Sequence, residues 1–178
     1  MPRPRTPLDE TKLEEMALAY VSRFATTRAK LEAYLRRKLR ERGWQGEREP
    51  SPQALCERFV ARGYVDDAAW ARMKAGSLLR RGYGGRRLGE ALQAAGISAE
   101  LRADVQPKPP EARRAALALA RRRRFGPFGA PPADPKAREK QIAAILRAGH
   151  TLDNAREIVD AADRAWLERW ADETEDFA

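Results

Sequence analysis

The heptapeptide Leu92-Gln-Ala-Ala-Gly96-Ile97-Ser98 decides how this chain folds. Its leucine comes four positions before a glycine, the residue that most readily takes the left-handed conformation at the end of a helix. An apolar residue follows the glycine, and the serine after it is a preferred N-cap for a new helix. The heptapeptide therefore predicts a junction between two helices.

The same pattern occurs twice more, at a constant spacing of 53 residues, as Leu39-(x3)-Gly43-Trp44 and as Ile145-(x3)-Gly149-His150-Thr151. A fixed spacing near 50 residues is typical of repeat proteins, in which each unit is too small to bury a good core alone. A repeat architecture is therefore expected.

The composition favours helices throughout. Ala, Leu, Arg and Glu dominate and strand-type alternation is hard to find, so no strand is predicted. We expect an all-α fold, an elongated array of three tandem three-helix repeats with about nine helices. Their expected ranges are roughly 7–24, 28–42 and 52–62, then 67–81, 85–95 and 98–105, then 110–124, 135–148 and 151–171.

Proline marks several of the expected helix starts. Thr6-Pro7, Ser51-Pro52 and Asp134-Pro135 each have an N-cap residue followed by a first-turn proline, and Thr6 with Asp9 resembles a capping box. The expected organisation is a flexible N-terminus over 1–6, repeats over 7–65, 66–107 and 108–171, a Gly/Pro loop over 125–133 within the third repeat, and an acidic tail over 172–178.

Several functional classes find no support in the residues. No run of about 18 apolar residues occurs and the first residues contain no secretory segment, so a cytoplasmic protein is expected. Cys56 and His150 are the only residues of their types, and packing roles are expected for both. No glycine-rich phosphate loop or Cys/His dyad appears. We expect no cofactor, no metal and no enzymatic activity.

Charge is distributed unevenly. The net charge is +9, but residues 1–152 carry 32 Lys/Arg against 17 Asp/Glu, whereas 153–178 carry 3 against 9. A basic body predicts a polyanionic partner such as nucleic acid or a nucleoprotein surface, with solubility alone as the alternative. The acidic end is either a solvating tail or a phosphate mimic that folds back on the basic face.

One string identifies a family resemblance. Gly63-Tyr64-Val65-Asp66-Asp67-Ala68-Ala69-Trp70-Ala71, with Leu35 to Gly43 before it and Leu79 to Ile97 after it, resembles the RecX family, modulators of the RecA recombinase. The resemblance is specific over about residues 20–100 and covers a weaker third repeat over about 110–165. It implies three tandem trihelical repeats, and a partner that is the RecA filament on single-stranded DNA.

The resemblance further implies that the protein binds the filament groove and limits filament growth, ATP hydrolysis, strand exchange and co-protease activity in DNA repair and the SOS response. A monomer that touches no membrane is expected. From the residues alone, a second interpretation stays open: a sequence-tolerant DNA-binding protein with helix-turn-helix-like units that acts independently of RecA.

The preferred contact site is the turn Gly82-Tyr83-Gly84-Gly85, because arginines bracket it and guanidinium groups meet phosphate or carboxylate with paired hydrogen bonds. The alternative is a plain helix connection with exposed charge. The candidates for contact with RecA or DNA are Arg80, Arg81, Tyr83, Arg86 and Arg87 at this turn, Arg36, Arg37 and Arg40, and Arg121, Arg122, Arg123 and Arg124.

The family string itself is expected to be structural. Asp66 and Asp67 point about 100° apart on a helix, so N-capping of the helix that holds Trp70 is favoured over a paired-carboxylate site. Tyr64 and Trp70 are expected to pack the joint between repeats, and Gly63 completes the motif.

Overall fold

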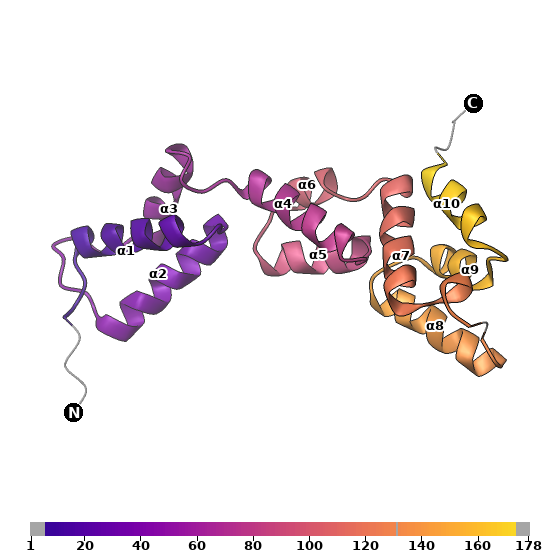
Figure 1. The fold of residues 1–178 in the computed structure, drawn as a ribbon. Helices are drawn as coiled ribbons and strands as arrows, with labels where there is room; N and C mark the ends of the chain where they lie inside the picture. Colours follow the sequence, from indigo (N-terminus) through magenta and orange to yellow (C-terminus); the bar gives the residue numbers. More distant parts are fainter. Residues whose placement is uncertain (1–5, 131, 174–178) are drawn as a thin grey trace. The chain divides into compact units, whose positions relative to one another are not determined.

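In the computed structural model of the chain, residues 6–130 and 132–173 are described (Figure 1). The predicted flexible N-terminus and acidic tail lie outside the described residues, except for Thr6, Asp172 and Glu173. The helices are α1 (Glu10–Arg23), α2 (Arg28–Arg42), α3 (Pro52–Ala61), α4 (Asp67–Arg80), α5 (Gly85–Ala94), α6 (Ala99–Asp104), α7 (Pro109–Arg123), the 3₁₀ turn η1 (Gly126–Phe128), α8 (Pro135–Arg147), α9 (Leu152–Asp160) and α10 (Arg164–Asp172).

The all-helical prediction is confirmed, since residues 6–130 and 132–173 contain no strand, only an isolated bridge between Leu8 and Trp44. The three repeated glycines all have positive φ, 78° at Gly43, 75° at Gly96 and 96° at Gly149. Local side-chain caps explain several helix starts, because Ser51, Asp134 and Thr151 each accept a hydrogen bond from the backbone N–H three residues later.

The predicted start of the first helix is wrong. Asp9, and not Thr6, is the N-cap of α1, and its carboxylate accepts the N–H of Lys12 at 2.8 Å. Leu8 is extended because its N–H donates to the carbonyl of Gly43 at 3.0 Å and its carbonyl accepts from the N–H of Gln45 at 2.8 Å. A long-range pairing thus replaces the first helical turn that the proline predicts.

The single helix predicted over 151–171 is also wrong. The backbone leaves the helix at Ala161, where ψ is 136°, and Asp163 caps α10 by accepting the N–H of Trp166 at 2.7 Å. The break resets the buried face, so Leu167 and Trp170 are buried while Trp166 is 38% exposed. In the predicted loop 125–133, η1 forms and Phe125 and Phe128 pack against the core.

The contacts between residues divide the chain into two compact units. The first unit comprises residues 1–71 and 94–98, and its core gathers apolar side chains from α1, α2 and α3. The fully buried members include Leu31, Leu35, Phe59 and Cys56, and burial raises the pKa of the Cys56 thiol to about 11.

The second unit comprises residues 72–93 and 99–178. Its core is formed by α7, α8, α9 and α10, with Ile145, Ile158 and Leu167 fully buried, and α10 packs along α7 (Figure 1). The further division into three repeats, with boundaries at 65/66 and 107/108, stays a prediction. Among the residues described, none of the helices combines the length and apolar character that crossing a membrane requires.

Candidate functional site

The turn between α4 and α5 is held by its own backbone and by two other helices. Gly82 has φ of 77°, and the N–H of Tyr83 donates to the carbonyl of Leu78 at 3.0 Å. A Cβ on Gly82 would lie 2.8 Å from the backbone nitrogen of Leu119, so α7 approaches as closely as a glycine allows. The N–H of Gly84 donates to the carbonyl of Ala148 at 2.9 Å. The turn is therefore a fixed platform between α7 and the end of α8.

His150 holds the same turn through a side-chain hydrogen bond. It is 7% exposed, and its Nε2 lies 2.9 Å from the carbonyl oxygen of Gly82, so the neutral ring carries its proton on Nε2 and donates it. The other ring nitrogen, Nδ1, is buried without a hydrogen-bond partner among the described residues. Burial lowers the pKa of His150, against a smaller opposing effect of the Gly82 carbonyl. The histidine acts in packing a helix junction.

Tyr83 lies between two hollows that are both lined by arginine. One, of about 380 Å³, is lined by Arg81 and Arg87 with Glu90, and the guanidinium carbon of Arg81 lies 5.4 Å from the centre of the Tyr83 ring. The other, of about 460 Å³, is lined by Arg122, Arg123 and Arg147. An Nη of Arg122 donates to the backbone carbonyl of Arg81 at 2.6 Å, which joins the two sides.

The structure thus brings together two candidate groups that are about forty positions apart in the sequence, one near Tyr83 and one at the end of α7. Arg147, on α8, was missed by the sequence analysis, because only the tertiary fold places it beside Tyr83. We refer to Arg81, Tyr83, Arg87, Arg122, Arg123 and Arg147 as the Tyr83 junction.

Not every predicted arginine belongs to this junction. Arg86 pairs with Glu90 at 2.6 Å and donates to the carbonyl of Leu146 at 2.9 Å, so it ties helices together. Arg87, which does belong to the junction, also pairs with Glu90 at 3.0 Å, and its hydrogen bond is the main reason that the pKa of Glu90 is lowered. Arg80 is exposed at the end of α4 and lines neither hollow.

The run at the end of α7 divides in the same way. Arg121 pairs with Glu168 on α10 at 2.5 Å, and its guanidinium carbon lies 5.7 Å from the centre of the Phe128 ring. Arg124 has φ of 57° and ends the helix in the left-handed conformation. Only Arg122 and Arg123 of this run line the hollow beside Tyr83.

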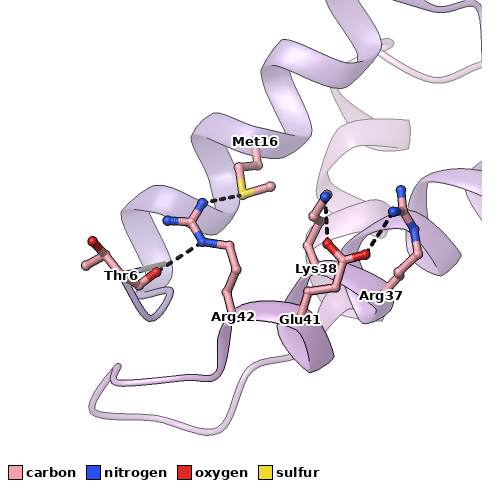
Figure 2. Close-up of polar contacts among 6 residues, drawn as sticks. All are labelled: Thr6, Met16, Arg37, Lys38, Glu41 and Arg42. Carbon is pink, nitrogen blue, oxygen red and sulfur yellow. Dashed lines mark hydrogen bonds and ion pairs between the residues drawn. The ribbon is translucent and has the colours of Figure 1, made fainter. Parts of the chain in front are cut away.

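The predicted contact arginines of α2 are partly neutralised by carboxylates of the same helix. Arg36 pairs with Glu32 at 2.7 Å, and Figure 2 shows Arg37 and Lys38 converging on Glu41, at 2.9 and 2.7 Å. The hydrogen bond from Lys38 is the main reason that the pKa of Glu41 is lowered, and the hydrogen bond from Arg37 adds to it.

Two other arginines of α2 behave differently from these pairs. Arg42 points away from Glu41, and its Nε donates to the carbonyl of Thr6 at 3.0 Å (Figure 2). Its Nη1 lies 3.8 Å from the Sδ of Met16. Arg40 is exposed and makes no ion pair within the described part of the chain.

The family string 63–71 forms a joint inside the first unit. Gly63 has φ of 74° after α3, and Tyr64 is half exposed with its ring edge-on to Phe59. Asp66 caps α4 by accepting the N–H of Ala69 at 2.8 Å, as N-cap residues do.

The neighbouring carboxylate, Asp67, serves another helix. It is the first residue of α4, and its Oδ1 accepts the N–H of Arg28, the first residue of α2, at 2.8 Å, whereas the sequence analysis assigned it to its own helix. Trp70 is 8% exposed and donates to the carbonyl of Ala25 at 3.3 Å. Its ring also lies beneath the ammonium of Lys30, 4.4 Å from the centre.

Comparison with known proteins gives consistent relatives. The chain matches no family model. It is 33% identical to the regulatory protein RecX of Myxococcus xanthus over 89% of both chains, and 31% identical to that of Mycobacterium sp. strain JLS over 86% of this chain and 85% of the relative. It is 40% identical to a regulatory protein RecX of Thermus thermophilus over 61% of this chain and 71% of the relative. The crystal structure of RecX from Lactobacillus salivarius superposes with a TM-score of 0.66 at 17% identity, over 84% of this chain and 94% of that one.

Proposed function

This chain belongs to the RecX family of regulatory proteins, and from that premise we propose that it regulates the RecA recombinase by binding in the groove of the RecA filament on single-stranded DNA. Bound there, it limits filament growth and with it the ATPase, strand-exchange and co-protease activities that depend on an extended filament. The proposed setting is DNA repair and the SOS response.

The observation that carries the proposal is the Tyr83 junction. Its arginines surround one half-buried phenol ring on a backbone platform that two other helices hold in place. Arg81, Arg123 and Arg147 are exposed and make no ion pair within the described residues. Guanidinium groups in such an array form paired hydrogen bonds with carboxylate or phosphate, the two anions that a RecA–DNA filament offers.

The test is the ATPase activity of RecA on single-stranded DNA with the added protein. Wild type is expected to inhibit, and Arg81→Glu/Arg123→Glu is expected to need about tenfold more protein for half inhibition, because repulsion replaces attraction at the junction. The matched control is Lys136→Glu/Lys140→Glu, which reverses the same number of charges at exposed residues that line neither hollow. It should stay close to wild type.

Two outcomes are informative in different ways. Full ATPase activity at saturating wild-type protein contradicts the regulatory function. Equal inhibition by wild type and both double variants leaves the function standing and removes the Tyr83 junction as the contact surface.

A second candidate function is sequence-tolerant DNA binding that acts without RecA. The excess of 32 Lys/Arg over 17 Asp/Glu in residues 1–152 favours it. A protein of this class should act equally on RecA-free DNA and should lose affinity steeply with salt, because its binding energy comes from counterion release. A filament regulator should act on RecA-coated DNA well below the concentration at which it coats bare DNA.

A further inference from the structure

A groove between α1 and α2 combines aromatic and basic side chains. It has a volume of about 720 Å³ and lies wholly within the first unit. Three aromatic residues line it, together with four cations and two alanines: Tyr20, Phe24, Tyr34, Arg23, Lys30, Arg37, Arg40, Ala19 and Ala33. We call this set the α1–α2 groove. Of these residues, only Arg37 and Arg40 are contact candidates predicted from the sequence.

The aromatic residues form one continuous array. Tyr20 and Tyr34 are stacked, with ring centres 4.3 Å apart and planes 22° from parallel, and the ring of Phe24 lies 5.3 Å from that of Tyr20. Phe24, the C-cap residue of α1, is 55% exposed. A stacked pair with a large exposed ring beside it offers flat apolar surface to a planar ligand.

The charges along the groove are of one sign. No carboxylate lines it, whereas Arg23, Lys30, Arg37 and Arg40 do. Arg37 forms an ion pair with Glu41 at 2.9 Å. Arg23 and Arg40 are exposed and make no ion pair in the described segments. Lys30 is exposed above the ring of Trp70. Charge complementarity therefore selects a polyanion.

We propose that the α1–α2 groove is a binding site for single-stranded nucleic acid. Bases stack on Phe24 and on the Tyr20–Tyr34 pair, while Arg23, Lys30 and Arg40 meet the phosphates. A single strand is required because bases of a duplex are already stacked on each other and expose no face to a protein ring. The site binds without sequence preference, since every base has a π-face.

The inference deepens the proposed function by naming a surface that meets the strand, and it rests on that function only for its biological setting. Acidic peptide is the other polyanion to consider. It would satisfy the cations and leave the exposed ring of Phe24 without a planar partner, so the aromatic array favours a nucleic acid.

The experiment measures fluorescence anisotropy of a labelled oligothymidylate titrated with the full chain, in the absence of RecA. Phe24→Ala is expected to weaken binding by about tenfold, the usual loss for one stacked base. The matched control is Leu18→Ala, which removes an apolar side chain that is 46% exposed on the same helix and does not line the groove. It should change the dissociation constant by less than about twofold.

A second pair of variants separates the groove from bulk charge. Arg40→Gln should weaken binding by several-fold, whereas Arg36→Gln, one turn away on α2 and outside the groove, should have a smaller effect. An oligonucleotide of abasic residues keeps the phosphates without the bases. It should bind more weakly than oligothymidylate and should be insensitive to Phe24→Ala. An oligouridylate arm tells whether the strand is DNA or RNA.

The proposal is overturned by equal binding of Phe24→Ala and Leu18→Ala, by equal affinity for abasic and base-bearing strands, or by displacement of the oligothymidylate by polyglutamate at equal charge. Circular dichroism confirms that each variant keeps its helices. If the wild type ignores bare strands yet inhibits RecA, only the groove is rejected. If it binds strands and RecA is unaffected, only the regulatory function is rejected.

Discussion

Two junctions that share one sequence pattern, Gly43-Trp44 and Gly149-His150, are surrounded very differently. A Cβ on Gly43 would meet nothing within 4 Å, whereas a Cβ on Gly149 would lie 2.6 Å from the backbone nitrogen of Arg87. Trp44 donates to the carbonyl of nearby Arg48 at 2.7 Å, while His150 contacts the carbonyl of Gly82, 68 positions away. The repeated pattern therefore specifies where a helix ends. The tertiary fold decides how many contacts with the rest of the chain are made at that end.

The backbone itself adds to the contrast. Gly43 combines φ of 78° with ψ of 177°, a region that only glycine occupies readily, and this directs the chain into the extended pairing with Leu8. Gly149 has φ of 96° and in addition lets α5 approach, since its carbonyl accepts the N–H of Arg86 at 3.2 Å. One glycine is needed for its conformation, and the other for its conformation and its small size.

The largest expected effect is that of Gly149→Ala. Backbone strain and the clash with Arg87 should together lower the free energy of unfolding by about 4 kcal/mol. Gly43→Ala, which introduces strain without a clash, should lower it by about 2 kcal/mol. Urea unfolding followed by circular dichroism measures both. Equal losses would mean that the two junctions are equivalent after all.

The next effect is that of His150→Leu, a substitution of similar size that cannot donate. It leaves the buried carbonyl of Gly82 without its partner, and the free energy of unfolding should fall by about 2 kcal/mol. The measurement is thermal unfolding by calorimetry. A variant as stable as the wild type would show that the hydrogen bond from His150 to Gly82 does not stabilise the Gly149-His150 junction.

A pH titration isolates the same residue. Burial lowers the pKa of His150 in the folded chain below its ordinary value of 6.5. As the pH falls through 6.5, the histidine is therefore protonated in the unfolded chain before it is protonated in the folded chain. Stability is therefore complete above that value and should fall as the pH drops through it. Because the chain has one histidine, His150→Gln should show a flat profile between about pH 7 and 5.5. A similar decline in the variant would assign the titration to another group.

The smallest effect is expected for Trp44→Phe. It removes one hydrogen bond to an exposed loop carbonyl and keeps most of the ring, so the loss should be about 1 kcal/mol or less. Urea unfolding beside His150→Leu provides the comparison. A loss larger than that of His150→Leu would reverse the ranking of the two junctions.

Local signals in the sequence are sufficient where the deciding contacts are local. The bounds of α2 are predicted correctly because Thr27, whose side chain accepts the N–H of Lys30, and Gly43 flank its apolar stripe. The start of α1 is missed because Leu8 pairs with Gly43 and Gln45, far along the chain. The break before α10 has a local signal in Asp163, an N-cap residue that the continuous periodicity of 151–171 obscured.

The candidate site divides along the same line. The ion pairs Glu32–Arg36, Arg37–Glu41 and Arg86–Glu90 have the spacing of neighbours on a helix, so the sequence contained the information that these arginines are partly neutralised. The gathering of Arg122 and Arg147 around Tyr83 has no local signal, and neither does the stacking of Tyr20 on Tyr34. Those arrangements depend on how separate helices pack.

The single thiol of Cys56 is a built-in probe for the opening of the first unit. Alkylating reagents attack a thiolate that they can reach, and Cys56 is fully buried with a pKa of about 11. Iodoacetamide labelling of the native protein therefore proceeds only when the core formed by α1, α2 and α3 opens. The rate of labelling reads the opening of the first unit alone, with no engineered probe.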